Sequence, residues 1–381
     1  MIYLDHNATS PLRPEARAAV ARALDIGGNP SSVHAAGRAA RAVIEDARET
    51  VAAFAGAVPG GVVFTSGGTE GNALALRGAI AGAAEAGEPI ARLLIEATAH
   101  ESVRAVAAAL AEATPALQLC EIPVDGSGHI DVAGLRAQLA SGTGRALVSL
   151  IFVNNETGAV EHIASLAKLV RAEAGAGTLI HVDAVSSGYC QIRFREWDAD
   201  YLSLSAHKLG GPQGAGALIV RGTAPLAPLF NGFAEMRRRG GTENVCGIVG
   251  FGAAVRALQQ NCEAEAARIA FIRQQFENAL EKFGATIFAG GADRAANTTC
   301  FAIPDLSAET ALMSLDLDDI CVSSGAACSS GKIGRSHVLK AMGVSDEVAR
   351  CALRVSFGWN STEDDADAAI AALEKLLTRI A

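Results

Sequence analysis

The chain has 381 residues, of which 50% are hydrophobic and 19% charged, and this balance excludes a disordered or fibrous protein. Its 32 basic and 41 acidic residues give a net charge of −9, so the basic surface needed to bind nucleic acid or an anionic membrane is missing. The length predicts about two or three domains. A small molecule is therefore the favoured kind of ligand.

The amino terminus, MIYLDHNATSP, lacks the basic start and the long apolar stretch of a secretion signal. The longest strand-like apolar run, 146–153, is far shorter than the roughly 20 residues that span a bilayer. The eight cysteines form no CxxC pair and show no metal-site spacing, so reduced thiols are expected. These features predict a cytoplasmic protein without a membrane segment or a bound metal.

Short apolar runs alternate with helical stretches through the first two thirds of the chain. The clearest early helix covers 33–54, where apolar residues recur every three or four positions and Gly56 follows as a stop. The strand-like runs are 62–65, 93–96, 146–153, 179–183, 201–204 and 217–220. This alternation predicts an α/β fold with a largely parallel sheet, whose ligand-binding loops follow the carboxyl ends of the strands.

The last third of the chain has fewer strand candidates, 298–303 and 353–357. A polar helix is expected over 261–273, and a final helix is expected to be capped by Ser361 or Thr362. Two strands are too few for another large sheet, so this part predicts a smaller α+β domain.

The expected domain boundaries follow from this change of pattern near residue 258. The large domain is expected to cover 13–258. Residues 1–12 and 259–381 are expected to form the small domain.

The first candidate site is a glycine-rich turn, SGGTEG at 66–71, between a predicted strand and a predicted helix. Such a turn presents backbone N–H groups and the positive end of a helix dipole to a phosphate. The segment lacks a P-loop lysine and does not match GxGxxG, so an ordinary turn is an equal alternative.

Lys208 lies in SAHKLGGP at 205–212, where a predicted strand ends and the chain turns through glycines. The sequence has six lysines, and the other five fall in helical patterns or in a loop. A partly desolvated lysine has a lowered pKa, which makes its amine a nucleophile toward an aldehyde. A solvated surface lysine is the alternative interpretation.

Three further polar residues follow predicted strands: Asp183, Asn155 and His100. Asp183 is suited to holding a protonated ring nitrogen, although a helix N-cap is an equal alternative. Singly, each residue indicates an ordinary turn. Together with Lys208 and the glycine-rich turn, they form the set that pyridoxal phosphate requires.

Two residues near the carboxyl end complete the candidates. Cys328 lies among small residues, 321–331, that predict a mobile segment able to carry this thiol into a site; a linker with an incidental thiol is the alternative. Arg354 stands in an apolar strand and is therefore either paired internally or directed at a carboxylate ligand.

Nearly the whole chain resembles the cysteine desulfurases of the NifS/IscS type, which are fold-type I pyridoxal phosphate enzymes. The resemblance implies a large domain with a mostly parallel seven-stranded sheet, and a homodimer. It rests on YLDHNAT at the start, GNPSS at 28–32, FTSGGTE at 64–70, AHESV at 99–103, VNNETG at 153–158, HVDA at 181–184, SAHKLGGPQG at 205–214, RGGTEN at 239–244 and SSGAACSSG at 323–331.

The resemblance also implies a role for each matched residue. Lys208 is expected to hold the cofactor covalently and to remove the α-proton, His100 to stack on its ring and assist proton transfer, and Asp183 to pair with the ring nitrogen. Cys328 is expected to accept the substrate sulfur as a persulfide. The other implied contacts are Asn155 near the cofactor hydroxyl and the substrate, Gly68, Thr69, Ser205 and His207 at the phosphate, Thr242 at the phosphate from the other subunit, and Arg354 with Asn29 at the substrate carboxylate.

The implied reaction converts L-cysteine to L-alanine and passes sulfur to an acceptor or iron–sulfur scaffold protein. Ser186 departs from the family, which usually has glutamine there, and it is too short for the same contact with the cofactor. Two alternatives stay open: a related lyase or aminotransferase, such as a selenocysteine lyase, and a non-catalytic sulfur-relay scaffold.

Overall fold

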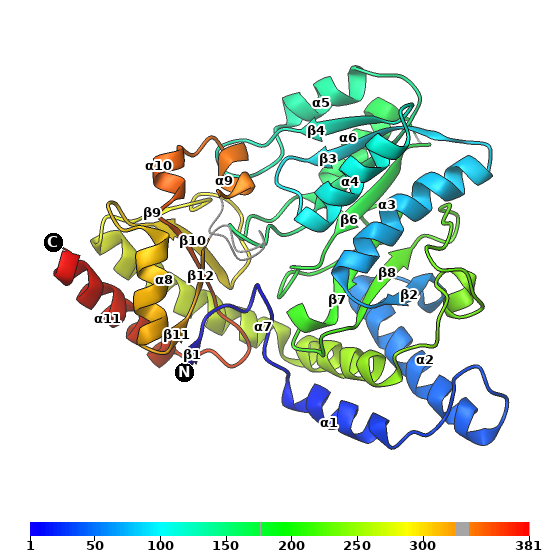
Figure 1. Ribbon diagram of the computed structural model, residues 1–381, viewed down its shortest axis with the longest axis horizontal. Helices are drawn as coiled ribbons and strands as arrows, with labels where there is room; N and C mark the ends of the chain where they lie inside the picture. Colours follow the sequence, from blue (N-terminus) through cyan, green and yellow to red (C-terminus); the bar gives the residue numbers. More distant parts are fainter. Residues whose placement is uncertain (176, 325–334, 381) are drawn as a thin grey trace.

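The computed structural model describes residues 1–175, 177–324 and 335–380, and its larger domain is built on a seven-stranded sheet (Figure 1). The strands are β2 (Val62–Thr65), β3 (Ile90–Glu96), β4 (Gln118–Ile122), β5 (Arg145–Ile151), β6 (Leu179–Asp183), β7 (Tyr201–Ser205) and β8 (Gly216–Val220). Their order is β2-β8-β7-β6-β5-β3-β4, and β8 alone runs antiparallel to its neighbours. The predicted largely parallel sheet is confirmed.

Helices cover both faces of this sheet. They are α2 (Ala35–Ala55), α3 (Gly68–Glu85), α4 (Glu101–Ala113), α5 (Val132–Ala140) and α6 (Ile163–Ala174), with short 3₁₀ turns η1 (Pro59–Gly61), η2 (Ala206–Lys208) and η3 (Glu235–Arg237). Helix α1 (Pro14–Leu24) packs instead against the long helix that joins the two domains. Leu94 and Val148 pack under α2, α5 and α6, whereas their neighbours Leu93 and Leu147 pack under α3 and α4. Because both faces are buried, the central strands read as continuous apolar runs, which is why the sequence predicts them well.

The edge strand β4 was not predicted. Leu117 and Cys120 are buried, but Gln118, Leu119 and Glu121 face solvent. An edge position leaves one side of the strand open, so the run carries polar residues and lacks the signature of the central strands.

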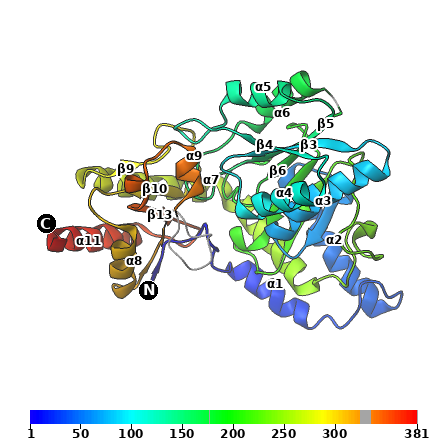
Figure 2. The same ribbon diagram turned by 45° about the horizontal axis from the view of Figure 1, so that its top comes forward.

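The smaller α+β domain has a four-stranded sheet in the order β12-β13-β10-β9, and both chain ends lie beside it (Figure 2). Its strands are β9 (Thr286–Ile287), β10 (Thr298–Ala302), β12 (Ser323–Ser324) and β13 (Ala352–Ser356); β1 (Ile2–Tyr3) pairs in parallel with β11 (Ile320–Cys321). Its helices are α8 (Ala308–Leu317), α9 (His337–Ala341), α10 (Asp346–Ala349) and α11 (Glu363–Ile380). Thr362 caps α11, because its hydroxyl and Asp365 accept each other's backbone N–H groups. Within the described residues, no helix has both the length and the apolar character that crossing a membrane requires.

One 38-residue helix, α7 (Val245–Lys282), connects the two domains, so the expected start of a helix at Asn261 was wrong. The first turns of this helix contain glycines that allow neighbouring helices to approach closely: a Cβ on Gly252 would lie 2.8 Å from the Cβ of Ala47 in α2. Residues up to Leu258 pack in the core of the larger domain, and residues from Ile269 pack in that of the smaller one. The expected domain boundary near 258 stays a proposal that this change of packing supports.

Candidate active site

A cavity of about 300 Å³ lies where the carboxyl ends of β5, β6 and β7 meet the small domain. Loops after β2 and β3 also line it, as does the amino-terminal segment around Asn7. The cavity therefore lies at the strand ends of a parallel sheet, where the sequence analysis expected a ligand site. The predicted residues that line this cavity are Gly68, Thr69, His100, Asn155, Asp183, Ser205, His207, Lys208 and Arg354.

Two predicted residues in the described part of the chain do not line the cavity. Asn29 is exposed in the loop between α1 and α2, where its side chain accepts the backbone N–H of Ser31. Thr242 lines a separate cavity beside Phe64 and Thr65. Cys328 lies outside the described residues. Their roles stay predictions. Thr242 was expected to contact the cofactor phosphate of the other subunit, so its absence from this cavity does not bear on that expectation.

One end of the cavity is built to receive an anion. Helix α3 begins at Gly68 without a side-chain N-cap, so amide groups of its first turn are available. Ser205 ends β7 with a hydroxyl that is buried yet has no hydrogen-bond partner among the described residues. A buried orphan hydroxyl beside a helix amino terminus fits a bound phosphate.

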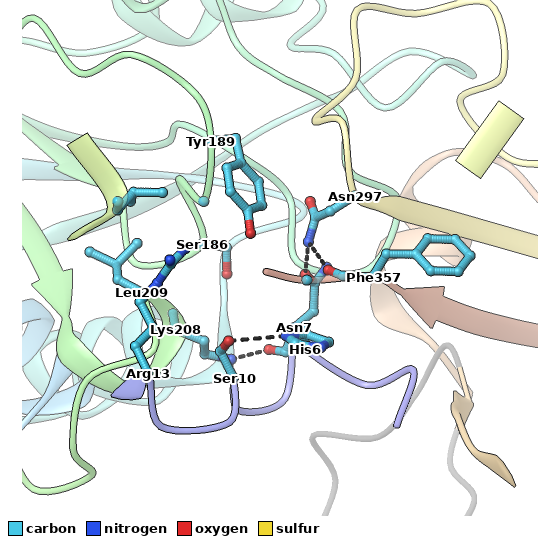
Figure 3. A pocket seen from close by; sticks show the side chains of 13 residues that line it. His6, Asn7, Ser10, Arg13, Ser186, Tyr189, Lys208, Leu209, Asn297 and Phe357 are labelled. Carbon is cyan, nitrogen blue, oxygen red and sulfur yellow. Dashed lines mark hydrogen bonds between the residues drawn. The ribbon is translucent and has the colours of Figure 1, made fainter. Parts of the chain in front are cut away.

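Lys208 follows Ser205 in the turn η2, and its ammonium group donates to the backbone carbonyl of Asn7 (Figure 3). Its neighbour His207 is held by the hydroxyl of Thr9, 3.1 Å from Nδ1. Burial, and then the nearby charge of Lys208, lower the pKa of His207 to about 4, so this imidazole is neutral at pH 7. The amino-terminal segment therefore fixes the direction in which Lys208 points.

Asp183 ends β6 and is buried. Its Oδ2 accepts from Nδ2 of Asn72 at 2.8 Å, and its Oδ1 accepts from the backbone N–H of Val185 at 3.0 Å. His100 caps α4 through Nδ1, and burial lowers its pKa, with a smaller effect from Lys208 in the same direction. The site thus presents a carboxylate and a neutral imidazole.

Arg354 is 2% exposed and pairs internally, one of the two outcomes that its position in an apolar strand allows. Its guanidinium donates to Asp5 Oδ1 at 2.6 Å and to the carbonyl of Asn155 at 3.0 Å. The buried Nε has no partner among the side chains and backbone described. An N–H therefore stays available to a carboxylate that enters the cavity.

Sequence reasoning missed three residues of the site, namely Asp5, Asn72 and Ser102. Asp5 lies in the YLDHNAT motif, but its partner Arg354 is 349 positions away, so the motif does not indicate the pairing. Asn72 faces the cavity from the first turns of α3, where the helical spacing from Gly68 was the available signal.

Ser186 lines both the main cavity and a smaller one beside it, which Lys208 and Tyr189 also line (Figure 3). A short side chain at this position leaves space next to Lys208. The expected departure from the family therefore lies within the site.

Glu156 is a buried carboxyl group beside the site, where it accepts from the hydroxyl of Ser336 at 2.5 Å. Burial raises its pKa from 4.5 to about 7, against the opposing effects of Ser336 and Arg354. Because the folded state holds this proton more tightly, the group stabilises the fold fully below its unfolded pKa. That contribution is lost as the pH rises through the folded pKa, a loss of about 3 kcal/mol.

We expect Glu156→Gln to remove this pH dependence. The free energy of unfolding of the unchanged protein should fall by about 3 kcal/mol more than that of the variant between about pH 5 and pH 8. Denaturant unfolding at both pH values measures the difference, and Glu121→Gln, at an exposed carboxyl, is the control. Parallel pH profiles for Glu156→Gln and the unchanged protein would contradict the assignment.

The family model for aminotransferase class-V matches residues 2–369. The chain belongs to the aminotransferase class-V family. It is 35% identical over 384 residues to the cysteine desulfurase IscS of Dictyoglomus turgidum, covering all of this chain and 95% of that protein. It is 38% identical over 386 residues to a cysteine desulfurase of Cereibacter sphaeroides, covering all of this chain and 96% of the relative.

Solved structures of this family agree with the fold. The NifS-like protein from Rickettsia africae ESF-5 superposes with a TM-score of 0.88 at 32% identity, over 99% of both chains. A structure described as SspA in complex with cysteine superposes with a TM-score of 0.79 at 27% identity, over 94% of this chain and 99% of that one.

Members of the aminotransferase class-V family of this type depend on pyridoxal phosphate, and the residues present fit it. The orphan hydroxyl of Ser205 and the amino terminus of α3 suit the phosphate. Asp183 suits the ring nitrogen, and the amine of Lys208 lines the same cavity. The polar groups of the cavity thus suit both the phosphate and the ring of the cofactor.

We expect Gly68→Ala to weaken cofactor binding. A Cβ at this position would lie 2.4 Å from Cγ2 of Val185, so α3 has to move away from the loop after β6. Overpacking of this kind costs about 1–3 kcal/mol, which corresponds to roughly a tenfold rise or more in the cofactor dissociation constant. Cofactor titration measures it, and Gly60→Ala, with nothing within 4 Å, is the control. Equal affinities for the two variants would count against the phosphate site at α3.

Proposed function

We propose that this protein is a pyridoxal phosphate-dependent cysteine desulfurase that acts on L-cysteine. The observation that carries the proposal is that Lys208, Asp183 and Arg354 line one cavity in a chain of this family. Relatives at 35% and 38% identity over the full length are named cysteine desulfurases, and the structure of SspA holds cysteine.

Each of four residues in the cavity is proposed to have a separate role in the reaction. When bound, the cofactor supplies an electron sink for negative charge at the substrate α-carbon. Arg354 binds the substrate carboxylate, which orients the α-hydrogen toward Lys208. The amine of Lys208 removes that proton, and His100 would stack on the cofactor ring and assist the proton transfer. Asp183 accepts the hydrogen bond of the ring nitrogen.

The sulfur is proposed to leave on Cys328. Its thiolate attacks the substrate sulfur, and an S–S bond forms. The C–S bond breaks, and its electron pair stays on the substrate carbon. Protonation of that carbon yields alanine, and the persulfide on Cys328 passes to an acceptor protein.

We expect Cys328→Ser to abolish alanine and persulfide formation while the cofactor absorbance stays unchanged. Serine lacks a thiolate, so the attack on the substrate sulfur cannot occur. Alanine is quantified after addition of L-cysteine, and Cys351→Ser, which alters a half-buried thiol beyond the cavity, is the control. Full activity in Cys328→Ser would favour a lyase or aminotransferase that needs no thiol, and absence of cofactor binding would favour a relay scaffold.

A homodimer completes the proposal, with Thr242 as the candidate contributor to the partner's site. In support, Phe233 is 86% exposed and Phe230 is 56% exposed in the segment that leads to Thr242. Large apolar side chains exposed together mark an interaction surface. Sedimentation velocity tests the dimer. A cytoplasmic location stays a proposal as well.

A further inference from the structure

Asn72 is a buried amide that the proposed mechanism does not use. It lies in α3 behind the phosphate end of the cavity and is 1% exposed. Its Nδ2 donates to Asp183 Oδ2 at 2.8 Å and to the hydroxyl oxygen of Ser102 at 2.9 Å. An ionised carboxylate only accepts hydrogen bonds, so the nitrogen of the amide must face Asp183.

Ser102 connects Asn72 to His100. Its hydroxyl oxygen lies 2.8 Å from Nδ1 of His100, and its own backbone N–H donates to the same nitrogen at 3.1 Å. A ring nitrogen that accepts a backbone N–H carries no proton, so the hydroxyl of Ser102 must also donate to it. The hydrogen bonds therefore run in one direction, from Asn72 through Ser102 to His100, and the proton of the neutral imidazole sits on Nε2.

We propose that Asn72 is a positioning residue for the two groups flanking the cofactor ring: it orients the carboxylate of Asp183 directly, and through Ser102 it favours the neutral form of His100. One nitrogen serves both groups, because its two N–H bonds reach Asp183 and Ser102. The carboxylate of Asp183 is held in place by the N–H groups of Asn72 and Val185, and His100 keeps its proton on Nε2. The roles of Asp183 and His100 rest on the proposed function, whereas the hydrogen-bond chain does not.

The other charged groups around His100 do not impose this tautomer. Lys208 acts on the imidazole in the same direction as burial, and Asp183 and Glu101 act in the opposite direction. On the remaining side, His337 of α9 contacts the carbonyl of Ala99 through Nε2 and does not reach Nδ1 of His100 by any hydrogen bond in the described part of the chain. Charge shifts the balance between neutral and charged imidazole, but the donors at Nδ1 decide which nitrogen holds the proton.

Asn72→Asp is the matched variant, because it keeps the shape and replaces the donor by an acceptor. The new carboxylate accepts from the hydroxyl of Ser102, so Nδ1 of His100 loses this donor and keeps only the backbone N–H of Ser102. We expect the pKa of His100 to rise by about one unit or more, because its neutral form is then less well stabilised. The like charge beside Asp183 also raises the cofactor dissociation constant by about tenfold or more.

The experiment follows the ¹⁵N signals of the His100 side chain through a pH titration, with and without cofactor and without cysteine. Asn72→Asp is compared in the unchanged chain and in a Ser102→Ala background. The proposal requires the rise in the pKa of His100 to be at least halved when the hydroxyl is absent. An equal rise in both backgrounds means that the new charge acts through space alone, and overturns it.

Ser102→Ala by itself keeps the test decisive if Asn72→Asp does not fold. Losing one of two donors to Nδ1 should raise the pKa of His100 while cofactor affinity stays within about twofold, because the bond from Asn72 to Asp183 remains. An unchanged pKa of His100 overturns the proposal. Failure of the desulfurase function would show as absence of alanine, which this titration does not measure.

Discussion

Replacing Lys208 with alanine is expected to lower kcat with L-cysteine by about a thousandfold or more. The amine at this position is both the proposed covalent anchor of the cofactor and the base that removes the α-proton, and each role alone contributes a large factor. Lys208 follows β7 and is held toward the carbonyl of Asn7, and no other lysine among the described residues lines the cavity. Alanine release measures the loss.

The matched control is Lys168→Ala, which removes an exposed lysine from α6 and should leave kcat unchanged. Borohydride treatment provides an independent readout, because it should fix the cofactor to the unchanged chain and to Lys168→Ala but not to Lys208→Ala. Covalent attachment in Lys208→Ala, or turnover within tenfold of the unchanged protein, would contradict the assigned role.

Replacing Arg354 with glutamine is expected to affect both substrate binding and stability. Its guanidinium is buried, and its loss leaves Asp5 without the partner that lies 2.6 Å away. Breaking a buried ion pair costs about 3–5 kcal/mol in the free energy of unfolding. The lost charged hydrogen bonds to the substrate carboxylate should raise KM for L-cysteine by roughly a hundredfold.

Arg256→Gln is the control, since it breaks a solvent-exposed ion pair with Asp46 and should change the free energy of unfolding by less than about 1 kcal/mol. Denaturant unfolding and initial-rate kinetics separate the two effects. A stability loss with an unchanged KM would restrict Arg354 to a structural role, and the substrate carboxylate would then need another partner.

Elements with a strong local pattern were predictable from sequence. The strands β5, β6 and β7 are buried on both faces, so their apolar runs stand out, and the cofactor-binding candidates directly follow them. The long helix α7 was only partly predictable, because its glycines weaken the local helical pattern and lie close to Val20 of α1, Pro212 and Ala47 of α2. The edge strand β4 carries the polar residues of a half-exposed strand.

The sequence by itself determined the α/β class, the family, and the main candidates Lys208, Asp183 and Arg354. Lys208 and Asp183 stand in local motifs whose residue types suit the cofactor, and Arg354 stands out as a charged residue in an apolar strand. Only the tertiary structure decided that Arg354 pairs with Asp5 and that Asn72 joins Asp183 to Ser102. These partners lie 349, 111 and 30 positions apart, and a hydrogen bond depends on distance and direction that no local pattern records.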